Sequence, residues 1–129
     1  MKSIVKMMLI VLLGTIVSCG EKEKPLYDQV MDIHDEVMPK MDVLYKAKKQ
    51  LQDSIAKTTN LSEEQKKEME VTILALDSAS NSMMVWMREF NPPDEKQDKE
   101  AFDAYMKSEL VRVKKMREQV MKALERIQK

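Results

Sequence analysis

The chain has 129 residues, of which 34% are charged, and its 22 basic residues balance 22 acidic ones. This balance argues against a nucleic-acid binder, which needs a basic surface. With one His, one Cys and two Gly, the sequence lacks the usual nucleophile and phosphate-binding constellations, so it predicts a protein that is not an enzyme.

The chain begins with the pattern of an export leader. Lys2 and Lys6 give it a positive start, and residues 7–17 form an almost wholly apolar run. This run fits the roughly 7–15 residues of a signal peptide and is shorter than the ~20 residues of a membrane-spanning helix. We therefore expect residues 1–18 to be removed, the alternative being an uncleaved membrane anchor.

The leader ends in Ile16-Val17-Ser18-Cys19-Gly20, which resembles a bacterial lipobox. The resemblance implies that Cys19 receives a diacylglyceryl group, that the chain is cut before it, and that the new amine is acylated. Two or more acyl chains anchor a protein stably to a membrane. Because Gly20 and not Asp follows the Cys, resemblance to well-studied lipoproteins favours the outer membrane. Residues 19–25 would then be the lipidated Cys and its tether, and residues 26–129 the domain.

The domain sequence predicts three helices, over residues 25–57, 62–90 and 95–128. These segments are rich in Lys, Glu, Met, Leu and Gln, which form helices well. The breaks between them lie at residues 58–61 and 91–94. Short links place neighbouring helices antiparallel. The predicted fold is all-α, an elongated up-down-up three-helix bundle with coiled-coil-like packing, and the alternative is that the helices pair between chains.

Apolar residues recur at steps of three and four along each helix, which predicts one core-facing stripe per helix. The first stripe comprises Tyr27, Val30, His34, Val37, Met41, Leu44, Lys48, Leu51 and Ile55. The second comprises Met69, Ile73, Leu76, Ser80, Met83, Met87 and Phe90. The third comprises Phe102, Met106, Leu110, Val113, Met116 (or Arg117), Val120, Leu124 and Ile127.

Several residues predict how the helices begin and end. Ser62 and Gln65 fit a capping box at the start of the second helix. Pro92, which has no N–H to donate, helps to stop that helix, and Asp94 would cap the third. Pro39 lies inside the first helix and should kink it.

A soft-metal site is one functional hypothesis. Imidazole and thioether groups suit Cu(I) or Ag(I), and an indole face attracts cations. Antiparallel pairing would bring the start of the first helix near the end of the second. The alternative is that these side chains are ordinary core, because Met commonly fills gaps between helices. The candidate ligands and their aromatic neighbour are His34, Met38, Met41, Met83, Met87 and Trp86.

Two resemblances bear on function. Leu61-Ser62-Glu63-Glu64-Gln65 is similar to the Leu-Thr-x-x-Gln motif of small helical periplasmic chaperones and stress sensors, although a capping box explains the same residues. The lipobox, the run His34–Met41 and the run Met84–Pro92 resemble a family of small Bacteroidetes lipoproteins that carry the name "viral A-type inclusion protein". That resemblance implies localisation and fold, and it implies no activity.

The sequence as a whole predicts a non-enzymatic interaction or scaffold module of the bacterial envelope. Its partners would be the membrane, through the N-terminal lipid, and another envelope protein or a second copy of itself. Residues 107–129 carry eight basic and three acidic residues, which would suit anionic headgroups or an acidic partner. The alternatives are the soft-metal protein and a chaperone-like stress sensor.

Overall fold

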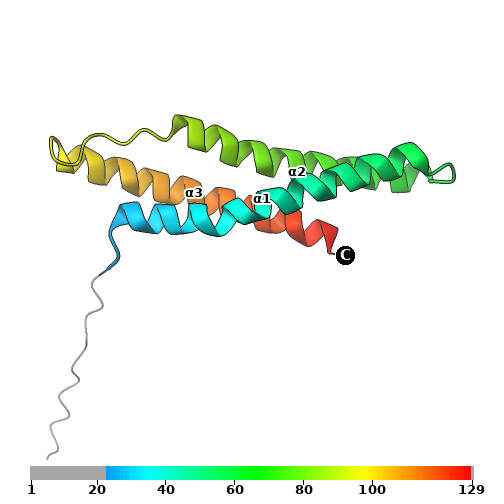
Figure 1. Cartoon of the computed structure of the whole chain (residues 1–129), viewed down its shortest axis with the longest axis horizontal. Coiled ribbons are helices and arrows are strands. Elements are labelled where there is room, and N and C mark those ends of the chain that lie inside the picture. The colour runs from blue at the N-terminus through cyan, green and yellow to red at the C-terminus, as the bar shows by residue number, and fades with distance from the viewer. Residues whose placement is uncertain (1–22, 129) are drawn as a thin grey trace, which may run out of the picture.

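A computed structural model describes residues 23–128 of the chain. It contains three helices, α1 (Leu26–Lys57), α2 (Glu63–Glu89) and α3 (Lys99–Ile127). Each helix packs against both others, and the three lie along one long axis (Figure 1). The predicted all-α, up-down-up three-helix bundle is therefore confirmed. The predicted leader and Cys19 lie outside the described residues.

Local chemistry explains where α2 begins. The Ser62 hydroxyl accepts from the Gln65 backbone N–H at 3.1 Å, and the Gln65 side-chain oxygen accepts from the Ser62 backbone N–H at 3.0 Å. The predicted capping box is thus confirmed. Glu63 and Glu64 in the first turn add favourable charges at the positive end of the helix.

The start of α3 differs from the prediction. The helix begins at Lys99 and not at residue 95, and its cap is Asp98, whose side chain accepts from the Ala101 backbone N–H at 2.9 Å. Asp94 instead accepts from the Lys96 backbone N–H at 2.9 Å, which closes a separate turn before the helix. The predicted Asp94 cap was wrong because this local turn satisfies the aspartate first.

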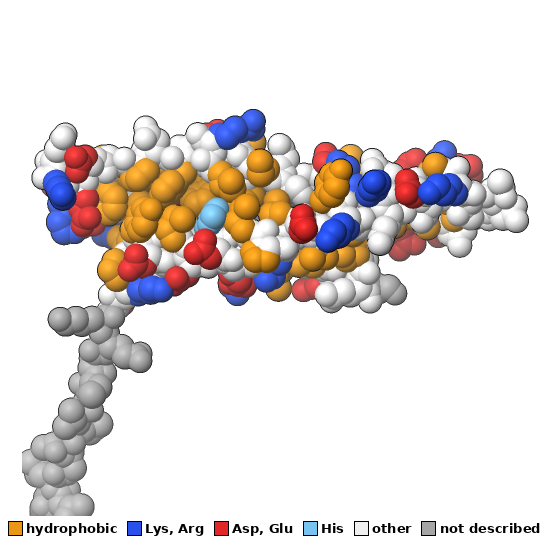
Figure 2. All heavy atoms as spheres, viewed as in Figure 1, with side chains coloured by type: hydrophobic (Ala, Val, Ile, Leu, Met, Phe, Trp, Pro, Cys, Tyr) orange, Lys and Arg blue, Asp and Glu red, His pale blue; other side chains and the backbone are white. Residues whose placement is uncertain are grey.

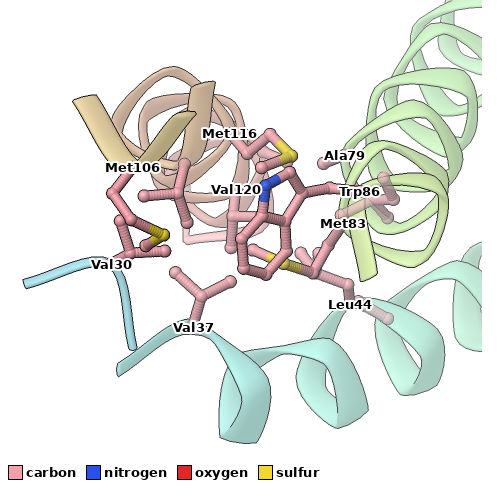
Figure 3. Close-up of a cluster of buried hydrophobic side chains, with 13 residues drawn as sticks. Val30, Val37, Leu44, Ala79, Met83, Trp86, Met106, Met116 and Val120 are labelled. Atoms are coloured by element: carbon pink, nitrogen blue, oxygen red, sulfur yellow. The ribbon is translucent and has the colours of Figure 1, made fainter. Parts of the chain in front are cut away.

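The core is a narrow seam that follows a seven-residue repeat in each helix. Val30, Val37 and Leu44 are fully buried at this spacing in α1. The other buried hydrophobic residues are Ala47, Leu76, Ala79, Met83, Trp86, Met106, Val113, Met116, Val120 and Ala123. Figure 3 shows this cluster, with the Trp86 indole pointing from α2 toward the middle of the bundle. All of these residues lie between positions 30 and 123, so the described residues contain this core by themselves.

The seam corrects the predicted stripes at several positions. Tyr27 and Met87, which were expected on the core side, are exposed. Trp86, which no predicted stripe included, is buried, and at position 109 a glutamate occupies the seam where the prediction placed Leu110. The buried residues alternate at steps of three and four, which keeps the seam facing the neighbouring helices. The predicted stripes departed from this spacing where they took the more apolar of two adjacent residues, as with Leu110.

One ion pair joins each pair of helices. Glu36 of α1 pairs with Arg117 of α3 at 2.9 Å, and Glu89 of α2 pairs with Arg112 of α3 at 2.7 Å. Lys48 of α1 pairs with Asp77 of α2. Exposed pairs add little stability, but pairs beside a helical seam help to fix which helix faces which.

Pro39 lies within α1, and the helix continues on both sides of it. The Lys40 ammonium donates to the Glu36 carbonyl oxygen at 3.1 Å, in the turn that the proline disturbs. Figure 1 shows α1 changing direction along its length as it follows the other helices. The helix therefore accommodates Pro39 without ending.

Candidate functional site

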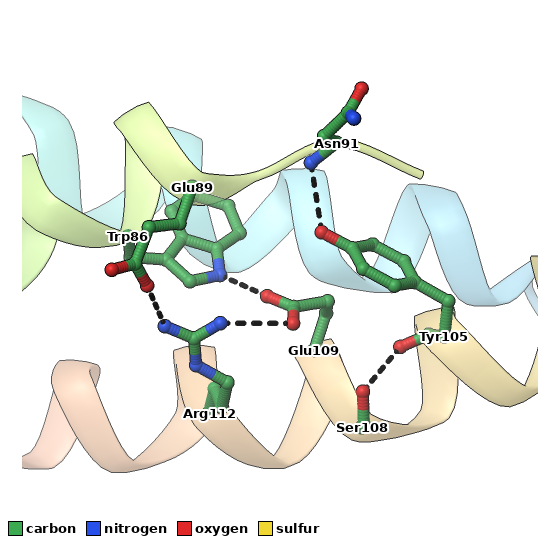
Figure 4. Close-up of polar contacts among 7 residues, drawn as sticks. All are labelled: Trp86, Glu89, Asn91, Tyr105, Ser108, Glu109 and Arg112. Atoms are coloured by element: carbon green, nitrogen blue, oxygen red, sulfur yellow. Dashed lines mark hydrogen bonds and ion pairs between the residues drawn. The ribbon is translucent and has the colours of Figure 1, made fainter. Parts of the chain in front are cut away.

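A charged network is built into the core where α2 ends. The Trp86 indole N–H donates to Glu109 Oε2 at 2.5 Å, and the Arg112 guanidinium donates to Glu109 Oε1 at 3.1 Å (Figure 4). Arg112 also donates to Glu89 Oε2 at 2.7 Å. Glu109 is only 3% exposed. Both of its carboxylate oxygens are therefore satisfied, which a buried charge requires.

Arg112 connects this buried carboxylate to solvent. Its side chain is 45% exposed, and it lies between Glu89 at the surface and Glu109 in the core. The hydrogen bond to Glu89 is the largest of the causes that raise the pKa of Arg112 above its ordinary value. Burial, the next largest, lowers this pKa, and the hydrogen bond to Glu109 raises it again. The guanidinium therefore stays charged across the range in which proteins are folded.

A cluster of four aromatic rings, one of which is Trp86, lies beside the network around Phe90. The Phe90 ring lies 5.0 Å from Trp86, 6.0 Å from Tyr105 and 6.4 Å from Tyr27, measured between ring centroids. The Tyr105 hydroxyl accepts from the Asn91 backbone N–H at 2.8 Å, which ties α3 to the link after α2. Tilted pairs at these distances are the favourable geometry for aromatic side chains. The cluster thus fixes the path of the chain as it leaves α2.

His34 of α1 lies against the same cluster. Its ring centroid is 5.9 Å from that of Trp86, so the predicted neighbourhood of these two residues is present. His34 Nδ1 lies 2.9 Å from a carboxylate oxygen of Asp35. Because a carboxylate can only accept, Nδ1 of the neutral ring carries the proton and Nε2 keeps its lone pair.

The methionines of the predicted metal site have different environments. Met83 is fully buried in the core, and Met38 and Met41 are half-buried against it. Met87 lies at the surface with 36% of its area exposed. Among the described residues, no group of three or more His, Cys, Asp and Glu side chains could hold a metal ion. Any site here would depend on His34 and thioether sulfurs, as the sequence hypothesis requires.

An apolar surface extends along α1 and α2 on the side away from α3. Figure 2 shows a broad orange area around the chain's single His, which lies between the two helices. Tyr27, Met84 and Met87 are exposed. We call the α1/α2 apolar face the surface of Tyr27, Met31, His34, Met38 and Met41 on α1 and Met84, Met87 and Phe90 on α2.

The register of the two helices explains why these side chains form one surface. Tyr27 of α1 lies level with Phe90 of α2, and His34 lies level with Trp86. Residues three and four apart in a helix share a face, so Met31 and Met38 flank His34 on α1. On α2, Met84 and Met87 extend the same surface at a spacing of three.

Sequence reasoning missed two of these features, the buried glutamate and the ring of Tyr105 against Phe90. Glu109 lies three residues after Met106 and four before Val113, which is the spacing of the buried seam. That spacing was the available signal for its burial.

Within the described part of the chain, no helix is long and apolar enough to cross a bilayer. Comparison of the chain with known protein families finds no matching family, and comparisons with curated proteins and with solved structures find no match either.

Proposed function

We propose that this chain is a lipid-anchored protein of the bacterial cell envelope that acts as a non-enzymatic interaction module. The observation that carries the proposal is the α1/α2 apolar face. Contiguous apolar surface is rarely left uncovered on a protein that functions alone. Methionine and aromatic side chains are enriched where proteins meet, because they are large and Met adapts its shape to a partner.

The position of the face suits an anchored protein. The lipobox resemblance places the acyl groups on Cys19, seven residues before the start of α1 at Leu26. A tether of this length spans at most about 25 Å when extended. The α1/α2 apolar face includes the first turns of α1, so the proposed anchor would hold this face close to the outer membrane, where other anchored proteins are concentrated.

Crosslinking at single positions tests the binding role. A photo-reactive amino acid at Met84 should give one discrete adduct in intact cells, which mass spectrometry can identify. The same group at Val71, which is exposed on α2 outside the face, is the matched control and should give none. Met87→Glu should abolish the Met84 adduct, because a charge buried in an apolar contact is costly. Equal labelling from Met84 and Val71 would contradict the proposal.

Anchoring is tested separately. Cys19→Ser should move the protein from the membrane fraction to the soluble fraction, and wild-type protein should carry the mass of its acyl groups. A protein that stays in the membrane fraction after this change would have a different attachment.

A soft-metal protein is the second candidate, and the geometry of His34 favours it. Histidines that bind metals commonly donate their other ring N–H to a carboxylate, which orients the ring, and Asp35 holds the Nδ1 side of His34 in this way. Met38 and Met41 lie at i+4 and i+7 from it on the same helix.

Titration with Cu(I) under reducing conditions tests this candidate. Binding should quench Trp86 fluorescence and saturate at one equivalent, because the indole lies beside His34. His34→Ala should remove the response, and Met121→Ala, on the surface of α3, should leave it unchanged. An unaltered spectrum on titration of wild-type protein would leave His34 with a packing role only.

A further inference from the structure

The outer surface of α3 carries a compact basic patch. Val111 is 69% exposed, the largest fraction among the exposed large hydrophobic residues of the described chain. Lys107, Lys114 and Lys115 lie at i−4, i+3 and i+4 from it, so all three border it on the helix surface. Within the described residues, none of these three lysines forms an ion pair. We call these four residues the Val111 patch.

The edge of the α1/α2 apolar face has the opposite charge pattern. Met31 has Asp28 at i−3 and Asp35 at i+4, and Met38 has Asp35 at i−3 and Asp42 at i+4. These three aspartates are exposed and form an acidic rim along α1. Figure 2 shows acidic side chains bordering the orange area on the α1 side. The α1 edge of this face therefore carries exposed aspartates, of which Asp42 also pairs with Lys46, whereas the Val111 patch carries exposed lysines.

The two surfaces cannot meet within one molecule. Arg112 on one flank of α3 pairs with α2, and Arg117 on the other flank pairs with α1. The Val111 patch lies between these flanks on the outer side of α3, directed away from the bundle. The α1/α2 apolar face lies on the opposite side of the same bundle. A complementary surface for each is thus available only on another molecule.

We propose that a second copy of this chain docks its Val111 patch on the α1/α2 apolar face. The lysines would meet the acidic rim, while Val111 would contact the methionines inside it. This inference rests on the proposed function, which makes that face a binding surface. Because the two surfaces differ, the contact is heterologous and repeats from copy to copy, into closed rings or open rows. Common attachment to one membrane would raise the effective concentration for such contacts.

Charge exchange between the two surfaces tests the proposal. The protein is residues 23–129, which contain the buried core, and circular dichroism first verifies that each variant is helical. Sedimentation velocity at low ionic strength should show wild-type protein associating beyond the dimer as its concentration rises. Asp28→Lys with Asp35→Lys, or Lys114→Glu with Lys115→Glu, should weaken association at least about tenfold, because each places like charges opposite one another.

Mixing identifies which surfaces meet. The two double variants mixed together should associate beyond the dimer in alternating order. The basic patch of one meets the acidic rim of the other, and the acidic patch meets the basic rim. All four substitutions in one chain should restore association. Lys66→Glu with Lys67→Glu, on the exposed start of α2, is the matched control and should associate like wild type. Added salt should weaken every complex, because the contact is partly electrostatic.

Three outcomes would overturn the proposal. One is wild-type protein that remains monomeric at every concentration, and another is a pair of double variants that remain monomeric when mixed. The third is a protein that remains monomeric and needs Lys114 and Lys115 only to bind anionic vesicles. That result would make the Val111 patch a membrane-binding surface. If the protein is monomeric while Met84 still crosslinks to a different protein in cells, the proposed function stands and this inference fails.

Discussion

Trp86→Ala is expected to lower the free energy of unfolding by about 3–5 kcal/mol, the range for large aromatic residues truncated in a core. Trp86 is buried in the core near the end of α2 and lies beside the rings of His34 and Phe90. Its loss would leave a cavity and remove a donor from Glu109. Because small domains are stable by only about 5–15 kcal/mol, the substitution would remove a large share of the total.

Urea unfolding followed by far-ultraviolet circular dichroism measures this effect, since Trp86 is the chain's single Trp and its fluorescence is lost in the variant. Trp86→Phe removes the N–H donor and part of the indole volume but keeps one aromatic ring, so it should cost less than Trp86→Ala. Leu74→Ala, on the exposed side of the same helix, should change stability by under about 0.5 kcal/mol. A cost near zero for Trp86→Ala would mean that the indole is not part of the folded core.

Arg112→Met is expected to destabilise the protein by about 2–3 kcal/mol. Removing one member of a fully buried pair costs about 3–5 kcal/mol, because the remaining charge loses its partner. The Arg112 side chain is 45% exposed, so water can replace part of what is lost, and the lower figure applies. The strength of the effect comes from Glu109, which stays in the core with only the Trp86 donor.

A mutant cycle separates charge from packing. In the Glu109→Gln background, Arg112→Met should cost under about 1 kcal/mol, because no buried charge is stranded. The amide oxygen can still accept from the Trp86 indole. Arg88→Met, which removes an exposed arginine one residue before Glu89, is the control and should have little effect. An equal cost of Arg112→Met in both backgrounds would show that its packing matters and its charge does not.

The sequence predicted the helices well where the local chemistry was unambiguous. Ser62 and Gln65 satisfy one another within one turn, so their pattern was enough to place the start of α2. At the start of α3, two aspartates compete for the role of cap. Asp94 is used in a turn and Asp98 caps the helix, and this choice depends on how the link packs against the bundle.

The core was harder to predict residue by residue. Glu109 and Leu110 are neighbours, and apolar character alone favours Leu110 for the interior. The structure places Glu109 there because Trp86 and Arg112 lie within reach of its two oxygens. Those partners come from a different helix and from the next turn, so the cost of burying the charge could be judged only after the helices were packed.

The sequence by itself determined the all-α class, the number of helices and their antiparallel order, since periodicity, breakers and short links are local properties of the chain. It also supplied the lipobox resemblance. The tertiary structure decided which of two adjacent residues faces the core, and it gathered methionines of α1 and α2 into one exposed surface. Both depend on the rotation and register of one helix against another. Contacts between residues far apart in the sequence establish that rotation and register.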